Sequence, residues 1–307
     1  MRRPARLPGA PRTCVRACDV VPRAPLIAAY KGPAGPDVLA FARIWSRTGG
    51  RPLQVVTVYP GQAPVGMGRT DAEWVAYNRE QAQALLAQAR ASLGDGPAEY
   101  RAVASESASH GLHDVMEAAG PEAMVVVGSR KTRGVRRTAP GSTADRLLQG
   151  APGPVVIVPW DYEDHPADPV RKVAVAYVDT PDARSALRAA VGIAAELDAE
   201  LQVISVLPDT RVRPSLGEPA RFGRDQRVGF QESLDAVVGS LPADLVTSLR
   251  LLEGPVVDTL ADLRPEDADL LVCGSRGYGP ARRVLLGGVS SRLLRHARLP
   301  VVIVPRG

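Results

Sequence analysis

The chain has 307 residues, 45% of them hydrophobic and 23% charged, which is too long for one small domain and typical of two globular domains of roughly 150 residues each. No apolar run approaches the ~20 residues that a bilayer-spanning helix needs, so we expect no membrane partner. The formal charge is +5, but the basic residues are interspersed with acidic ones and only 4% of residues are aromatic, so we expect no nucleic-acid partner.

Residues 1–23 precede the first predicted strand and differ in composition from the rest of the chain. They contain six arginines and one acidic residue, without the apolar stretch of a secretory signal. We expect a disordered extension or a start codon assigned too early. The three cysteines (Cys14, Cys18 and Cys273) have no metal-ligand spacing and cannot form a disulfide framework, which favours a reducing, cytoplasmic setting.

Several segments occur twice in the chain, in the same order and at nearly the same offset. The segment PVVIVP at 154–159 returns unchanged at 300–305, and GSR at 128–130 returns at 274–276, each after 146 residues. Repeated matches at one offset indicate a duplicated domain.

The first copy is expected to span residues 24–160 and the second copy residues 170–307. Residues 161–169, between them, are rich in acidic side chains and include two prolines, as is typical of a linker.

Each copy alternates between short β-branched runs and longer segments with helical spacing. Helices are predicted, for example, at 73–94 and 183–197. The strand runs are nearly continuous in apolar residues, which is typical of parallel strands buried on both faces. They lie at 25–30, 53–58, 97–104, 123–128, 154–159, 172–177, 201–206, 246–252, 269–274 and 300–305. Such alternation predicts doubly wound α/β sheets, in which ligands bind beyond the carboxyl ends of the strands.

A glycine-rich loop follows the fourth strand of the second copy. Glycines at 274, 277, 287 and 288 precede Ser290 and an amphipathic helix predicted at 292–297. Glycines let a backbone approach a ligand closely, and the first N–H groups of a helix attract anions. The Ser290 hydroxyl could cap this helix or bind a phosphate oxygen. The alternative is that the glycines only form a turn. The P-loop and GxSxG motifs are absent from the sequence.

The spacing Gly274-x2-Gly277-x9-Gly287, followed by a helix and the PVVIVP strand, resembles the nucleotide-binding motif of universal stress proteins. The likeness extends over both copies, so the chain looks like a tandem universal stress protein. The resemblance implies a five-stranded, mainly parallel sheet flanked by helices in each domain, with an adenine nucleotide alpha-hydrolase-like fold. It also implies adenine nucleotide binding and dimerisation through the last strand. In a tandem chain the two PVVIVP strands could pair within one molecule, and a homodimer could also form.

The resemblance implies a nucleotide site in the second copy, with two departures from the family pattern. Gly288 stands where the family has Ser or Thr, and Val178 stands where it has Asp, with Asp179 one residue later. The implied binding residues are Tyr177, Val178, Asp179, Val206, Gly274, Arg276, Gly277, Gly287, Gly288, Val289 and Ser290.

The first copy departs further from the family motif. Lys131 replaces the second glycine of the motif, and Lys31 replaces the Asp, although Ser142 is kept. We therefore favour a degenerate second site. Its residues are Lys31, Val58, Gly128, Gly141, Ser142 and Thr143.

Together these observations predict a stress-response protein that binds ATP or a related adenine nucleotide, with or without Mg²⁺, as a regulatory ligand and chiefly in the second copy. We expect neither catalytic residues nor a protein-bound metal. One alternative is a nucleotide-free interaction or dimerisation module, which the departures at Lys31, Lys131, Val178 and Gly288 favour. The other is a weak ATP hydrolase, for which Asp179 is the only obvious base in the second copy.

Overall fold

The computed structural model describes residues 23–63, 71–130, 140–208, 219–275 and 288–305. The expectations for residues 1–22, and those for Lys131, Arg276, Gly277 and Gly287, lie outside these ranges.

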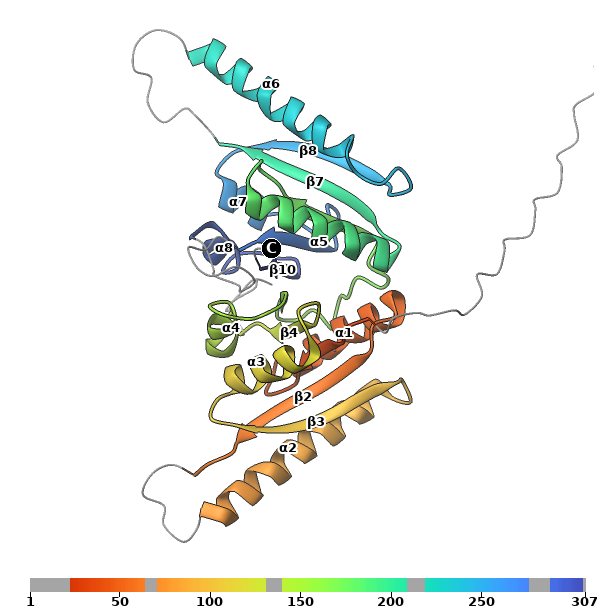
Figure 1. The fold of residues 1–307 in the computed structure, drawn as a ribbon, viewed down its shortest axis with the longest axis vertical. Coiled ribbons are helices and arrows are strands. Elements are labelled where there is room, and N and C mark those ends of the chain that lie inside the picture. The colour runs from red at the N-terminus through yellow and green to blue at the C-terminus, as the bar shows by residue number, and fades with distance from the viewer. Residues whose placement is uncertain (1–22, 64–70, 131–139, 209–218, 276–287, 306–307) are drawn as a thin grey trace, which may run out of the picture.

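The first half of the chain alternates strands with helices (Figure 1). Its strands are β1 (Leu26–Ala29), β2 (Leu53–Pro60), β3 (Ala98–Ser105), β4 (Met124–Gly128) and β5 (Val155–Val158). Its helices are α1 (Gly35–Gly49), α2 (Asp71–Leu93), α3 (Ala108–Ala119) and α4 (Ser142–Leu147). The helix ends follow local sequence: α1 ends where Gly50 adopts the left-handed conformation, with φ of 68°, and the Ser107 hydroxyl caps α3.

The second half repeats this order. Its strands are β6 (Lys172–Ala176), β7 (Glu200–Leu207), β8 (Thr247–Glu253), β9 (Leu270–Gly274) and β10 (Val301–Val304). Its helices are α5 (Pro181–Leu197), α6 (Pro219–Val238), α7 (Val256–Ala261) and α8 (Gly288–Leu293). Every predicted strand is present. The predicted helix at 292–297 is misplaced, because α8 begins at Gly288.

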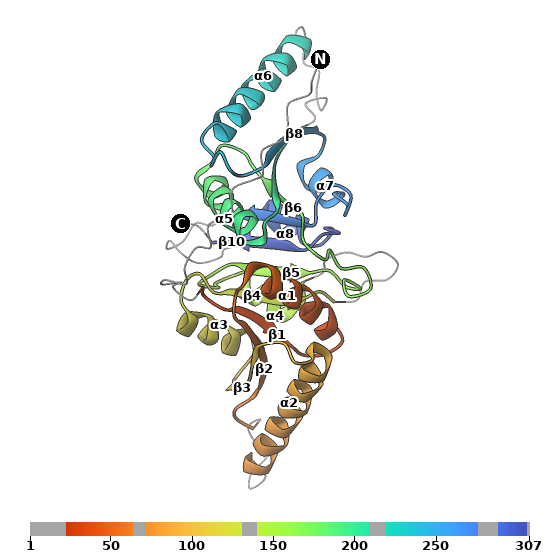
Figure 2. The same ribbon diagram turned by 90° about the vertical axis from the view of Figure 1, so that its right-hand side faces the viewer.

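The strands form one sheet in the order β3-β2-β1-β4-β5-β10-β9-β6-β7-β8. Within each half all neighbouring strands are parallel, and β5 meets β10 in antiparallel pairing with Val302 opposite Val156. The predicted α/β class, with a mainly parallel sheet in each of two domains, is confirmed. Helices α2 and α6 lie at opposite ends of the elongated molecule (Figure 2).

Two hydrophobic layers cover the two faces of the sheet. One contains side chains of α1, α2, α5 and α6, including Phe41, Trp45 and Ile193. The other contains side chains of α3, α4, α7 and α8, including Leu112 and Leu293. Among the residues that the structure describes, we find no helix with the length and apolarity needed to cross a bilayer.

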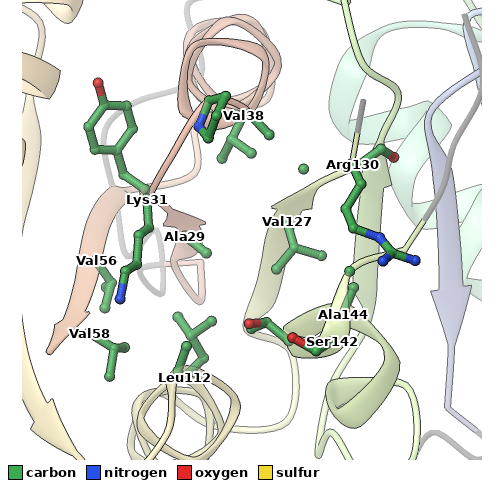
Figure 3. Close-up of a pocket in the computed structure, with 18 of the residues that line it drawn as sticks. Ala29, Lys31, Val38, Val56, Val58, Leu112, Val127, Arg130, Ser142 and Ala144 are labelled. Carbon is green, nitrogen blue, oxygen red and sulfur yellow. The ribbon is translucent and has the colours of Figure 1, made fainter. Parts of the chain in front are cut away.

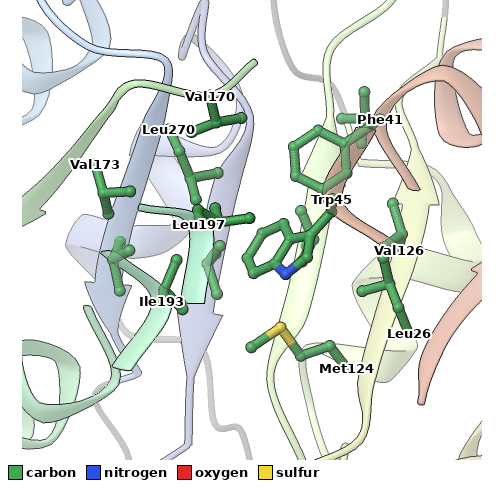
Figure 4. Packing of buried hydrophobic residues seen from close by; sticks show 14 of the residues in the cluster. Leu26, Phe41, Trp45, Met124, Val126, Val170, Val173, Ile193, Leu197 and Leu270 are labelled. Carbon is green, nitrogen blue, oxygen red and sulfur yellow. The ribbon is translucent and has the colours of Figure 1, made fainter. Parts of the chain in front are cut away.

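The first layer continues across the junction between the halves (Figure 4). The Trp45 indole Nε1 donates a hydrogen bond to Glu196 Oε1 at 2.6 Å, and Arg51 Nε donates to the same oxygen at 2.8 Å. The ring of Tyr162, which belongs to the segment between the halves, is buried with its centroid 5.6 Å from that of Phe41. Tyr162 therefore anchors this segment to the core, while most of residues 161–169 stay exposed.

Candidate functional site

The chain changes direction within the sheet between β1 and β4. From β1 it proceeds to β2 on one side, and from β4 it proceeds to β5 on the other. Such a switch point leaves a crevice beyond the carboxyl ends of the two strands, where doubly wound proteins bind ligands. In the first half a cavity of about 610 Å³ opens at this place, within the range of small-molecule sites.

An apolar wall lines most of this cavity (Figure 3). Val56 and Val58 come from β2 and Val127 from β4, while Val38 and Leu112 come from α1 and α3. These side chains are held by the hydrophobic layers on the two faces of the sheet. A flat apolar group such as a nucleobase or sugar could rest against this wall.

The polar side chains of the cavity come from the loops that follow β1 and β4. The structure brings together all six residues that the sequence assigned to the degenerate site, namely Lys31, Val58, Gly128, Gly141, Ser142 and Thr143. Sequence reasoning missed Arg130, which also lines the cavity. Its signal was the repeated GSR segment, since the matching Arg276 was named in the second copy.

Lys31 and Arg130 lie on opposite sides of the cavity (Figure 3). Both side chains are exposed, and no Asp or Glu is among the described residues that line the cavity. No cluster of potential metal ligands occurs in the described ranges either. Lys31 and Arg130 are thus the charged side chains among the described lining residues, and both are positive, which suits an anionic ligand.

The glycine at the end of β4 allows two backbone segments to meet. A Cβ atom on Gly128 would lie 2.6 Å from the Ala34 Cβ and 2.9 Å from the Ala34 carbonyl oxygen. Gly141 has φ of −85°, and a Cβ there would contact only the Arg130 side chain, at 3.5 Å or more. Neither glycine adopts positive φ. The close approach of Ala34, and not the backbone conformation, therefore explains why residue 128 is a glycine.

The residues assigned to the first strand of the second half face helix α6. Tyr177, Val178 and Asp179 line a cavity of about 370 Å³ together with Gly229 and Ser233 of α6. Asp179 Oδ1 accepts hydrogen bonds from Arg184 Nε at 2.8 Å and from the Tyr177 hydroxyl at 3.2 Å.

The ionisation of this pair follows from those contacts. The hydrogen bond from Arg184 lowers the pKa of Asp179 below its ordinary value, while burial is the main cause that raises the pKa of Tyr177. The Asp179 carboxylate is thus ionised at neutral pH and already paired with a guanidinium group.

Of the remaining described residues of the second site, Val206 lies on β7, and the others lie at the end of β9 and in α8. Val206 is buried in the second hydrophobic layer, and a Cβ on Gly274 would lie 2.6 Å from the Asp182 carbonyl oxygen. Gly288 and Val289 begin α8. Of the two roles considered for Ser290, capping is ruled out, because this residue lies inside α8 and its hydroxyl donates to the Gly274 carbonyl at 3.1 Å.

Comparison with known proteins agrees with the repeated architecture. The sequence model described as "Universal stress protein family" matches residues 31–159 and again residues 169–305. A universal stress protein of Mycobacterium tuberculosis is 29% identical over 286 residues, covering 89% of this chain and 97% of that protein. One from Mycolicibacterium smegmatis is 31% identical over 237 residues, covering 73% of this chain and 74% of its own length.

Solved structures give the same fold. The crystal structure of a universal stress protein from Archaeoglobus fulgidus superposes with a TM-score of 0.69 and 18% identity, covering 93% of this chain and 99% of that one. With the family matched in both halves and the topology shared, the chain belongs to the universal stress protein family and carries two domains of it in tandem.

Proposed function

We propose that this stress-response protein binds an adenine nucleotide as a regulatory ligand, without turning it over, in the cavity between β1 and β4. The observation that supports this most directly is the composition of that cavity. An apolar wall, two cationic side chains and the hydroxyl groups of Ser142 and Thr143 line about 610 Å³ at the switch point of the sheet. A nucleotide offers the matching chemistry, a flat base and sugar joined to an anionic chain.

The residues of the cavity divide between the two parts of such a ligand. Val56, Val58 and Leu112 offer the base and sugar an apolar surface. Arg130 supplies several N–H donors to phosphate oxygens, and the hydroxyls of Ser142 and Thr143 lie at the start of α4 on the same side of the cavity. Any Mg²⁺ would arrive with the phosphates, since no carboxylate is among the described lining residues.

Binding without turnover is supported by the same residues. Transfer of a phosphoryl group to water needs a base or a residue that orients the attacking water. The described lining of the cavity includes no Asp, Glu or His. The ligand would instead stabilise the form of the protein that binds it. The stabilisation is about 2.7 kcal/mol when the free ligand concentration is a hundred times the dissociation constant.

The second half is a further candidate for nucleotide binding, because its sequence keeps the more complete glycine motif. There the site would lie around Gly274 and the loop that follows it. We also infer that the β5–β10 pairing holds the halves together within one chain, which the antiparallel register supports.

The test is calorimetric titration of the full-length protein with ATP and Mg²⁺, comparing two tryptophan substitutions on α3. Ala108 lines the cavity, whereas Ala118 is exposed on the same helix outside it. We expect Ala108→Trp to remove one equivalent of bound ATP and Ala118→Trp to bind as the wild type does. If Ala108→Trp binds the wild-type amount with the wild-type affinity, the cavity is not the site. If the wild type binds no adenine nucleotide, the interaction-module alternative is favoured.

A further inference from the structure

The two cationic residues of the first-half cavity each follow a backbone position that the sheet anchors. Lys31 follows Tyr30, whose N–H donates to the Val56 carbonyl at 2.9 Å and whose carbonyl accepts from the Thr57 hydroxyl at 2.8 Å. Arg130 follows Ser129, whose N–H donates to the Val158 carbonyl at 2.9 Å. Each cationic residue therefore starts from a backbone position anchored just beyond a strand.

The cations lie apart, with the apolar wall between them. Figure 3 shows Lys31 on the side of Val56 and Val58, and Arg130 on the side of Ala144. Among the described residues, neither side chain is within ion-pair distance of a carboxylate in the cavity. A single cluster of phosphates at Arg130 would leave the Lys31 ammonium without an anionic partner.

The chemistry of Lys31 restricts what the ligand presents at that end. An ammonium group has three donors and no acceptor, so it cannot accept a hydrogen bond from a ribose hydroxyl. A phosphate on that hydroxyl would supply charged acceptor oxygens, which form the stronger, charge-assisted hydrogen bonds.

Resting on the nucleotide binding proposed above, we propose that this cavity prefers a nucleotide that carries a second anionic group on its ribose, such as adenosine 3′,5′-bisphosphate. The 5′-phosphate contacts Arg130, the base and sugar lie along the apolar wall, and the ribose phosphate pairs with Lys31. The second half serves as an internal comparison, because the residue that follows Tyr177 there is Val178, whose side chain is 43% exposed and uncharged. No such preference is expected in the second half.

The test measures the affinities of the full-length protein for adenosine 3′,5′-bisphosphate and for adenosine 5′-monophosphate at constant ionic strength. At the site that Ala108→Trp blocks, the bisphosphate should bind at least about tenfold more tightly than the monophosphate. This is the gain expected from one charge-assisted hydrogen bond. Lys31→Gln should reduce the ratio of the two affinities to about one. The conservative Lys31→Arg should keep the ratio high.

Arg43→Gln provides the matched control, because it removes one positive charge from an exposed position of α1 outside the cavity. It should leave the wild-type ratio unchanged. Equal affinities in the wild type, or a ratio that persists in Lys31→Gln, would overturn the proposal while leaving nucleotide binding intact. If neither nucleotide, nor ATP, binds at the Ala108-sensitive site, the proposed function itself has failed.

Discussion

Gly128 and Gly274 occupy equivalent positions, at the ends of β4 and β9. In both halves a side chain at this point would collide with the turn that begins the first helix of that half, at Ala34 in one case and Asp182 in the other. The sequence motif suggests glycines that make room for a ligand. The structure assigns these two a packing role, since they let the strand and the helix start come together and so close one wall of the crevice.

We expect Gly128→Ala to lower the free energy of unfolding by about 1–3 kcal/mol, because the added methyl group would be forced against backbone and Ala34. Urea denaturation followed by circular dichroism measures the difference. The matched substitution is Gly141→Ala, where the space is open and φ is ordinary, and it should change the stability by less than about 1 kcal/mol. Equal denaturation midpoints for Gly128→Ala and the wild type would show that the turn can move aside.

At the scale of elements, the first turn of α1 holds the segment that leaves β5. The Asp37 side chain is only 3% exposed, and its carboxylate accepts a hydrogen bond from the Glu163 N–H at 3.0 Å. Burial raises the pKa of Asp37, although hydrogen bonds from the backbone of Glu163, Asp161 and Tyr162 oppose the shift. Burial and the Asp37 charge also raise the pKa of Glu163. Acidic side chains thus lie close together where the two halves are connected.

This contact predicts a stability that depends on pH in a definite direction. With a raised pKa in the folded state, Asp37 binds more protons folded than unfolded between its ordinary pKa of 3.8 and the raised value. Stability should therefore fall as pH rises through this window, by at most about 1.4 kcal/mol per pH unit for one carboxyl group. Above the window the effect is constant.

Asp37→Asn should reduce that slope, even if the loss of carboxylate hydrogen bonds also lowers stability at every pH. Thermal or urea unfolding measured from pH 4 to pH 7 gives the slope for each variant. Asp95→Asn, at an exposed turn, is the matched control. If the slope in Asp37→Asn equals that of the wild type, the pH dependence arises from other groups.

The strands could be predicted from sequence because continuous β-branched runs have few ways to be buried except inside a parallel sheet. The start of α8 could not be predicted in this way. A serine before a periodic segment is typical of a helix cap, yet Ser290, Leu293, Leu294 and Ala297 are all buried at the spacing of one helix face. Ser290 thus belongs to a buried face, and its hydroxyl bonds to the Gly274 carbonyl instead of capping the helix.

Sequence reasoning named residues of the first-half cavity but ranked that site below the one in the second half. Counting motif glycines favoured the second half, because glycines report where a backbone can approach a ligand. A cavity depends instead on side chains from distant segments, such as Val38 and Leu112, which meet only when α1 and α3 pack on opposite faces of the sheet. The loop at 276–287 lies outside the described residues, so the second-half site stays a prediction.

At the scale of the whole molecule, a buried ion pair joins the two halves. The Arg51 and Glu196 side chains are only 11% and 6% exposed, and Glu196 also accepts the Trp45 hydrogen bond. Arg51 further donates to the carbonyl groups of Ala24 and Glu122. The charges are thus paired and hydrogen-bonded, as buried charges must be.

We expect Glu196→Ala to cost about 3 kcal/mol or more, because it would leave Arg51 and the Trp45 N–H buried without their acceptor. Equilibrium denaturation of the full-length protein measures the loss. Glu253→Ala is the control, since it breaks an ion pair with Arg227 whose side chains are each more than half exposed, and it should cost no more than about 1 kcal/mol. Similar costs for the two variants would mean that the junction depends on apolar packing alone.

The antiparallel meeting of β5 and β10 also decides where ligands can reach the protein. The strands on either side of the first-half crevice all belong to that half, and the corresponding strands of the second half lie beyond the β5–β10 pair. All described residues that line the first-half cavity come from that half of the chain, so a ligand can occupy it without contributions from the second half.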